Sequence, residues 1–269
     1  MVCLQCVIHM QFDLALPSAV FLIVAVLVFL YRKVEKTFTL LFEDQKFTAR
    51  DAVLMVASMG IMVSVIAFLP GQAIQIGFIV AYSYMLFVFT YMVLKKWYLA
   101  AVSPIIFLVS YIYLFSNLAV FNIFVVVFAM VITIYLSSFF TWKTVWAFAA
   151  ILTVMDIIHI YVTGFMKQAA IGMIELKLPV MLILPRVPSG NLIGLGTGDL
   201  FLAGLLAVQT AKKLGQKAGI LVAAMNGVAM FVFEVISFNT GFADFFPATI
   251  VVMAGWLASL GAIHLITST

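Results

Sequence analysis

Residues 118–140 read LAVFNIFVVVFAMVITIYLSSFF and contain no charged side chain. A helix needs about 20 mostly apolar residues to cross a bilayer, so this segment is long enough for one crossing. The whole chain has the same character, since 66% of its 269 residues are hydrophobic and only 9% are charged. A soluble domain is about half apolar and about a quarter charged. The composition therefore predicts a polytopic membrane protein in contact with the lipid bilayer, and the net charge of +4 indicates topology and not a nucleic-acid partner.

Eight further stretches have the length and apolar character of a membrane span. We therefore predict an all-α fold with nine transmembrane helices. The spans are Leu14–Tyr31, Ala52–Leu69, Ala73–Leu94, Trp97–Phe115, Leu118–Phe140, Thr144–Val162, Leu192–Ala211, Gly219–Phe238 and Pro247–Ile266. Only two connections are long, and the first of them, Arg32–Asp51, is predicted to be a solvated amphipathic loop.

The second long connection, Gly164–Asn191, contains a short apolar run bracketed by prolines at Pro179 and Pro185. Prolines at both ends forbid a continuous helix and leave a segment of strand length. An apolar strand has an unpaired backbone edge, which is unusual unless another strand pairs with it. The sequence thus predicts a strand-like segment between the sixth and seventh helices.

Two acidic residues, Asp156 and Asp199, lie well inside predicted spans. A charge in the membrane interior is costly and indicates a functional site. Asp156 lies six residues before Val162, about 9 Å along a helix, and Asp199 lies seven residues after Leu192, about 10.5 Å from the same side. The antiparallel course of consecutive spans therefore brings the two carboxyls to nearly the same depth.

Two carboxyls in contact share one proton, so one acts as an acid and the other as a base. The base can deprotonate a water that attacks a peptide carbonyl, while the acid protonates the carbonyl oxygen. This is the arrangement of aspartic proteases. The alternatives for each residue alone are a structural role facing a polar cavity and a proton relay in a transporter.

The surroundings of Asp199 read Gly196-Thr197-Gly198-Asp199, a G-x-G-D motif within an apolar span. This resembles the catalytic motif of the presenilin and signal peptide peptidase family of intramembrane aspartyl proteases. Met155-Asp156 stands where that family has Y-D in the sixth span, and Pro247-Ala248-Thr249 stands where it has P-A-L at the ninth. The resemblance covers roughly Thr144–Ile266 and is strongest to the compact archaeal homologues.

The resemblance implies a protease that cleaves transmembrane segments or remnant signal peptides, with Asp156 and Asp199 as the catalytic pair and Gly196 and Gly198 as the motif glycines. It also implies that the run before the second catalytic helix pairs with an extended substrate and that the P-A-T tripeptide helps to hold it. The implied substrate-binding residues are Leu178, Pro179, Val180, Met181, Leu182, Ile183, Leu184, Pro247, Ala248 and Thr249. Residues 1–143 then form a scaffold of five helices, and residues 144–269 form the catalytic part. Because Gly164–Asn191 is much shorter than the loop that is cut in eukaryotic presenilins, no self-cleavage and no obligatory partner subunit are expected.

Two other functions use the same acids. Prepilin-type peptidases also have G-x-G-D, but they usually carry a lysine two residues after the aspartate, where this chain has Phe201. A proton- or cation-coupled transporter would more often show an inverted repeat and broken helices in both halves.

No cofactor and no metal are predicted, because H-E-x-x-H does not occur and the C-x-x-C pair Cys3 and Cys6 has no second half. His159, one turn after Asp156, could bond to it, and the plainer interpretation is a polar residue near a helix end.

The basic residues predict the orientation in the membrane. Eleven of the fourteen Lys and Arg residues lie in the odd-numbered loops, and only Lys167, Lys177 and Arg186 lie in the even-numbered ones. The positive-inside rule places the odd loops in the cytoplasm. We therefore expect a multi-pass protein of the cell membrane with its N-terminus outside and its C-terminus in the cytoplasm.

Overall fold

The computed structural model describes residues 11–41, 46–241 and 246–268 and is almost entirely helical. Cys3 and Cys6 lie outside the described residues. Seven of the described helices are long and apolar enough to cross a membrane. These are α1 (Ala15–Leu41), α2 (Ala49–Ile66), α3 (Gly71–Leu94), α6 (Leu118–Ser137), α7 (Trp142–Ile157) with the π-helical turn η1 (Ile158–Val162), α10 (Gln216–Thr240) and α11 (Ala248–Ser268). The protein is thus a multi-pass, all-α membrane protein, as its composition predicts.

Two of the nine predicted spans differ from the other seven. The predicted span Trp97–Phe115 is two shorter helices, α4 (Trp97–Ala100) and α5 (Val102–Tyr113). Pro104 stands near the start of α5, and a proline cannot continue the hydrogen-bond ladder from the preceding turn. The predicted span Leu192–Ala211 begins as a strand, and its helix, α9 (Thr197–Leu214), carries three charged residues, Asp199, Lys212 and Lys213.

Two connections also differ from the sequence prediction. The loop expected to begin at Arg32 is wrong in its first part, because α1 continues as a helix to Leu41. The connection after Val162 contains an unpredicted helix, α8 (Phe165–Glu175), which follows the left-handed residue Gly164. A glycine adopts that backbone conformation without the steric cost that other residues bear. The chain can therefore turn sharply there and begin a new helix.

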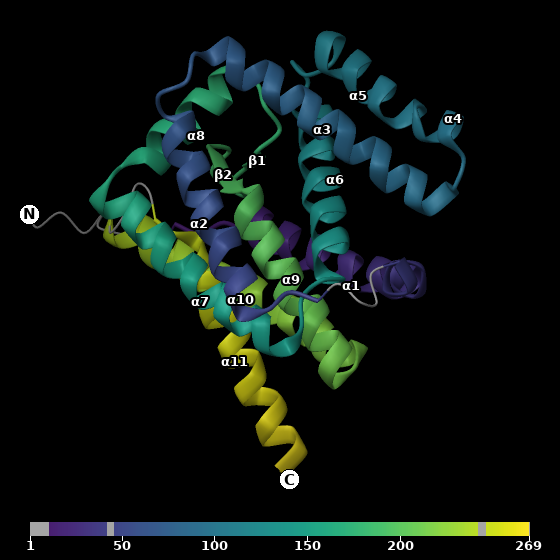
Figure 1. Cartoon of the computed structure of the whole chain (residues 1–269). Coiled ribbons are helices and arrows are strands. Elements are labelled where there is room, and N and C mark those ends of the chain that lie inside the picture. Colours follow the sequence, from purple (N-terminus) through teal and green to yellow (C-terminus); the bar gives the residue numbers. More distant parts are fainter. Residues whose placement is uncertain (1–10, 42–45, 242–245, 269) are drawn as a thin grey trace, which may run out of the picture.

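Helix α9 is the centre of the molecule (Figure 1). It packs against α1, α6, α7, α10 and α11, and every residue from Asp199 to Thr210 is buried. Close helix packing needs small residues at the contact. A Cβ atom at Gly219 of α10 would lie only 2.7 Å from the Cβ of Ala211 at the end of α9, so only glycine fits there. Since α1 and α6 come from residues 1–143, the predicted scaffold and catalytic parts pack together around this helix.

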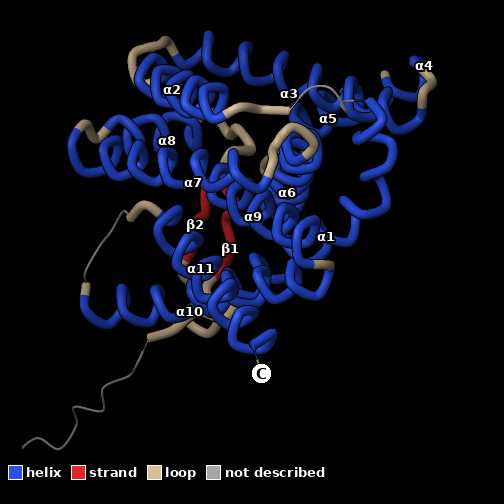
Figure 2. Tube along the Cα trace, turned by 60° about the horizontal axis from the view of Figure 1, so that its bottom comes forward, coloured by secondary structure: helices blue, strands red, loops and turns tan. Residues whose placement is uncertain are grey.

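Two short strands form a hairpin that leads directly into α9. Strand β1 (Met181–Pro185) pairs antiparallel with β2 (Leu192–Gly196), with Leu182 opposite Leu195 and Ile183 opposite Gly194. Figure 2 shows the hairpin enclosed by helices, and β1 contacts α6 and α1. The prediction of a strand in this connection is confirmed, although the strand begins at Met181. Its partner is a segment of the same chain that we had predicted to be helical.

Helices α3, α4 and α5 lie together at one side of the molecule (Figure 1). An aromatic cluster joins them to α6. Tyr82 lies 4.2 Å from Phe107 and 5.1 Å from Phe128 between ring centroids, and its hydroxyl donates a hydrogen bond to the carbonyl of Phe124. Most other side chains of α3 and α5 face outward, as expected for helices that contact lipid.

Candidate active site

Asp156 lies near the end of α7 on its buried face. The helix begins at a capping box, in which Thr141 and Thr144 satisfy each other's backbone N–H groups. From there a buried stripe at Val145, Ala149 and Leu152 runs along one face at helical spacing. Asp156 continues this stripe and is only 5% exposed. The residue after it, Ile157, ends the regular helix before the π-helical turn η1.

Asp199 lies in the first turn of α9 and is 9% exposed. The first turn is fixed to the hairpin, because the backbone N–H and the hydroxyl of Thr197 both donate to the carbonyl of Val180. The depth argument from the sequence used a helical rise from Leu192 onward, and this is wrong, because residues 192–196 are extended. The position of Asp199 is instead set by the end of strand β2.

The two motif glycines have different surroundings. A Cβ atom at Gly196 would lie 3.0 Å from the Oδ2 atom of Asp199, so a side chain there would press on the carboxyl. Gly196 has φ −61° and ψ 143°, a conformation open to any residue, so the close approach is what requires glycine. Gly198 is exposed, and a Cβ atom there would meet nothing within 4 Å. The structure therefore explains Gly196 and gives no contact that requires Gly198.

Asp156 and Asp199 come together from α7 and α9, which pack against each other. They are close enough for the charge of Asp156 to act on the carboxyl of Asp199. Thr249, the second residue of α11, lies beside Asp156, and its hydroxyl is close enough to interact with that carboxyl. It does not reach the geometry of a formed hydrogen bond. Pro247 is buried just before α11, and of the P-A-T tripeptide only Thr249 is brought near Asp156.

The outer edge of β1 is occupied by a side chain. Asn122 of α6 accepts a hydrogen bond from the Ile183 N–H at 3.0 Å and donates one to the Ile183 carbonyl at 2.6 Å. In an antiparallel pair, the backbone N–H and C=O groups of successive residues alternately bond to the partner strand and point away from it. The Arg186 N–H bonds to Asn191 and the Thr197 N–H to Val180, so Ile183 and Gly194 point outward. Within the part of the chain that the structure describes, no strand pairs with the outer edge of β2, where Gly194 is exposed.

The other predicted substrate-binding residues fall into two groups that differ in how far they are buried. Leu178, Pro179 and Leu182 are buried within the protein. The remaining residues of the run, Val180, Met181, Ile183 and Leu184, are partly buried. The first group is therefore part of the core beneath the hairpin, and the structure does not bring it to a free surface.

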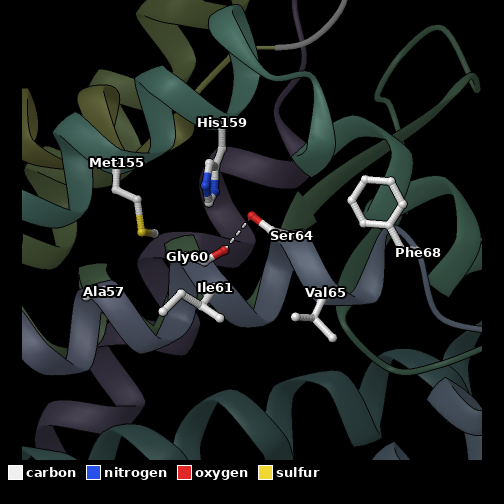
Figure 3. Close-up of a pocket in the computed structure, with 8 residues that line it drawn as sticks. All are labelled: Ala57, Gly60, Ile61, Ser64, Val65, Phe68, Met155 and His159. Atoms are coloured by element: carbon white, nitrogen blue, oxygen red, sulfur yellow. Dashed lines mark hydrogen bonds between the residues drawn. The ribbon is translucent and has the colours of Figure 1, made fainter.

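An open cavity of about 520 Å³ lies between α2 and the end of α7 (Figure 3), and Met155 and His159, which stand on either side of Asp156 in the sequence, line it. Its walls are mostly apolar, and its polar groups come from Ser64 and His159. Met155 and His159 point toward α2 at Gly60, where a Cβ atom would lie 2.8 Å from the Met155 sulfur. The Nδ1 atom of His159 is buried without a hydrogen-bond partner in the described structure. His159 therefore faces α2 and this cavity, and no hydrogen bond joins it to Asp156.

Sequence reasoning missed two residues that hold the hairpin. One is Asn122, which looked like an isolated polar residue in an apolar span. The other is Asp13, which is fully buried and accepts hydrogen bonds from the N–H groups of Ala15, Leu16 and Val187. The interval between Asp13 and Val187 along the chain leaves no local pattern from which this contact could be found. Asp13 thus caps α1 and fixes the turn of the hairpin at the same time.

A second buried acid, Glu234 of α10, lies within electrostatic range of Asp13 and Arg186. Neither of its carboxyl oxygens has a hydrogen-bond partner among the described residues. The Arg186 guanidinium stacks on Phe238, with its carbon 3.8 Å from the ring centre. These charges lie at the far end of the hairpin from Asp199. In the described ranges, no three His, Cys, Asp or Glu side chains converge as ligands of a metal ion.

The geometry of the site is therefore a pair of buried carboxyls from two helices, a hydroxyl beside one of them, and a strand edge that ends at the other. Compared with known proteins, the chain matches no family model and no curated protein. The resemblance to presenilin-like proteases consequently rests on the sequence motifs around Asp156, Asp199 and Pro247 alone.

Proposed function

We propose that this protein is an intramembrane aspartyl protease, in which Asp156 and Asp199 hydrolyse peptide bonds of transmembrane substrates. The observation that supports this most strongly is that two buried carboxyls, more than 40 residues apart in the sequence, lie within electrostatic range of each other on helices that pack together. Burial of an acid is costly, and burial of two in contact is costlier still. Such a pair is expected where its shared proton is used in catalysis.

The chemistry needs one ionised and one protonated carboxyl. The ionised one takes a proton from water as the water oxygen adds to the peptide carbonyl carbon, while the protonated one gives its proton to the carbonyl oxygen. The resulting diol collapses, the C–N bond breaks, and the amine leaves with the proton that the first carboxyl had taken. As the C–N bond breaks, one hydroxyl of the diol gives its proton to the second carboxyl and becomes the carbonyl oxygen of the new carboxylic acid. Both carboxyls are then back in their starting forms, and no cofactor is needed.

The free edge of β2 supports a place for the substrate backbone. A helix hides its peptide bonds, so a substrate must be extended before it is cut, and an extended chain can add to an exposed strand edge. Since Asn122 occupies Ile183 on the outer edge of β1, we propose the outer edge of β2 in place of the Leu178–Leu184 edge. Gly194 has no side chain to obstruct an added strand, and Gly196 at the end of β2 lies next to Asp199.

The cavity between α2 and α7 supports a route to the acids from the lipid. Its outer wall consists of Ile61, Val65 and Phe68, whose side chains are 65%, 47% and 74% exposed. Apolar side chains at an outer opening suit a substrate helix that arrives through the membrane. Met155 and His159 form the inner wall, one residue before and three after Asp156.

A transporter that uses the same acids and a prepilin-type peptidase are the rival functions, and one experiment separates all three. Purified protein is incubated separately with a transmembrane peptide and with a prepilin-like peptide that carries a basic residue before its apolar segment, and cleavage is measured. The same protein is reconstituted in liposomes, and ion uptake is measured. Cleavage of the transmembrane peptide that is lost in both Asp156→Asn and Asp199→Asn supports the proposal. Cleavage restricted to the prepilin-like peptide, or uptake without any cleavage, would contradict it.

A further inference from the structure

Thr249 is a buried hydroxyl that its own helix does not use. Its side chain is 2% exposed, and its Oγ1 atom has no formed hydrogen bond in the described residues. Threonines inside helices usually bond to the carbonyl four residues earlier. Thr133, Thr153 and Thr210 all do so in this protein. Thr249 is only the second residue of α11, so the residue four positions earlier precedes the helix.

The packing of α11 holds Thr249 at the acid pair. Trp256, two turns further along α11, packs on Trp146 of α7 with ring centroids 4.2 Å apart and ring planes tilted by 43°. Its indole N–H donates a hydrogen bond to the Thr210 hydroxyl of α9 at 2.9 Å. Trp256 thus fixes α11 against both helices that carry the aspartates. Trp146 and Asp156 lie on one helix and Trp256 and Thr249 on the other, so the packing of α11 on α7 brings the buried Thr249 hydroxyl within interaction range of the Asp156 carboxyl, short of a formed hydrogen bond.

The two carboxyls are therefore not equivalent. Asp156 has a hydroxyl donor next to it, whereas no donor of the described chain bonds to the carboxyl of Asp199. A hydrogen bond to a carboxylate favours its ionised form, and a buried carboxyl without a donor favours the protonated form. Since the pair holds one proton, the site is asymmetric even before the substrate binds.

Building on the proposed function, we propose that Thr249 is a positioning residue that donates a hydrogen bond to Asp156 and makes Asp156 the base of the pair, with Asp199 as the acid. In this assignment Asp156 takes the proton of the attacking water, and Asp199 gives its proton to the carbonyl oxygen of the substrate. The leucine that the resemblance leads one to expect at this position could not donate such a bond. The hydroxyl is a feature of this chain's own site.

The first test is kinetic and uses matched variants. Thr249→Val keeps the shape of the side chain without the hydroxyl, and Thr249→Ser keeps the hydroxyl. We expect Thr249→Val to lower the turnover of a transmembrane peptide about tenfold, the factor associated with one hydrogen bond to a charged group. The acid side of its pH profile should move to higher pH, and Thr249→Ser should recover the original profile. Thr153→Val, on the same helix as Asp156, removes a hydroxyl that bonds only within α7 and should leave the profile in place.

The second test does not depend on proteolysis. In an Asp199→Asn background, infrared difference spectra follow the protonation of Asp156 with pH, with Asp156→Asn as the subtraction. Thr249→Val should move the midpoint to higher pH, and Thr249→Ser should restore it. A moved midpoint without cleavage in the wild-type protein would overturn the proposed function and leave the contact established. Cleavage with identical midpoints in all three forms would overturn the role of Thr249 and leave the protease established.

Discussion

Gly196 offers the sharpest test of how the site is held, because a single methyl group placed there would press on Asp199. In Gly196→Ala the new Cβ atom begins 3.0 Å from Oδ2, closer than almost any contact of a real Cβ atom. The carboxyl must therefore move by a few tenths of an ångström. Since a misplacement of about 1 Å can cost about 10²-fold in rate, this movement should lower kcat about tenfold. The backbone conformation of Gly196 suits alanine, so the free energy of unfolding should change by less than about 1 kcal/mol.

Gly198→Ala is the matched control two residues along the chain. A Cβ atom there meets nothing within 4 Å and lies in the first turn of α9, where alanine is preferred to glycine. It should raise the thermal midpoint, by the equivalent of about 0.5 kcal/mol, without disturbing the Asp199 carboxyl. The assay measures kcat and KM for a fluorogenic transmembrane peptide in detergent, with thermal unfolding of each variant. If Gly196→Ala turned over the peptide as fast as the wild type, the close approach of Gly196 to Asp199 would have no role in catalysis.

Four further predictions test other parts of the proposed site and topology. Cleavage should follow a bell-shaped pH profile, because low pH protonates both carboxyls and high pH ionises both, and a flat profile would argue against a shared proton. Asn122→Leu removes both hydrogen-bond partners of Ile183 and should cost about 1–3 kcal/mol of stability, so an unchanged thermal midpoint would refute the anchoring role of Asn122. Leu192→Pro removes a donor from the outer edge of β2 at an exposed position and should raise KM for extended substrates more than it lowers kcat; equal kinetics in this variant would show that substrate does not pair there. A phosphatase that is active only outside the cell should be silent when fused after Thr269, whereas a fluorescent protein fused there should glow; the reverse result would invert the proposed orientation.

The sequence was sufficient for the class of fold, and it predicts the pairing of Asp156 with Asp199, which the structure brings within electrostatic range of each other. Long apolar runs predict helices reliably, because a backbone in lipid must satisfy its own hydrogen bonds. Acidic residues are rare in such runs, so two of them in neighbouring spans are candidates for one common site. The depth count that joined them used the wrong geometry for residues 192–196, since a run of apolar residues and glycines does not distinguish a short strand from a buried helix.

The parts that could not be predicted all depend on contacts distant along the chain. Asn122 and Ile183 are 61 residues apart, and Asp13 and Val187 are 174 apart. Thr249 stood out only as a departure from a family motif, and its place beside Asp156 follows from the packing of Trp256 against α7 and α9. No periodicity in a single sequence encodes such side-chain contacts.

The central position of α9 determines which parts of the molecule can respond to the membrane around it. A helix enclosed by five others cannot tilt or shift alone, so the hairpin and Asp199 form a stiff unit whose amide protons should be among the last to exchange with solvent. Only 17% of the apolar segment of α2 and 11% of that of α3 are buried inside the protein, so most of their surface is in contact with the surroundings of the protein. Bilayer thickness and lateral pressure therefore act on these outer helices and on the opening between α2 and α7, while the hairpin and α9 stay unchanged. If the protein is the proposed protease, it should consequently show different KM values, with a nearly constant kcat, in vesicles of short-chain and long-chain lipids.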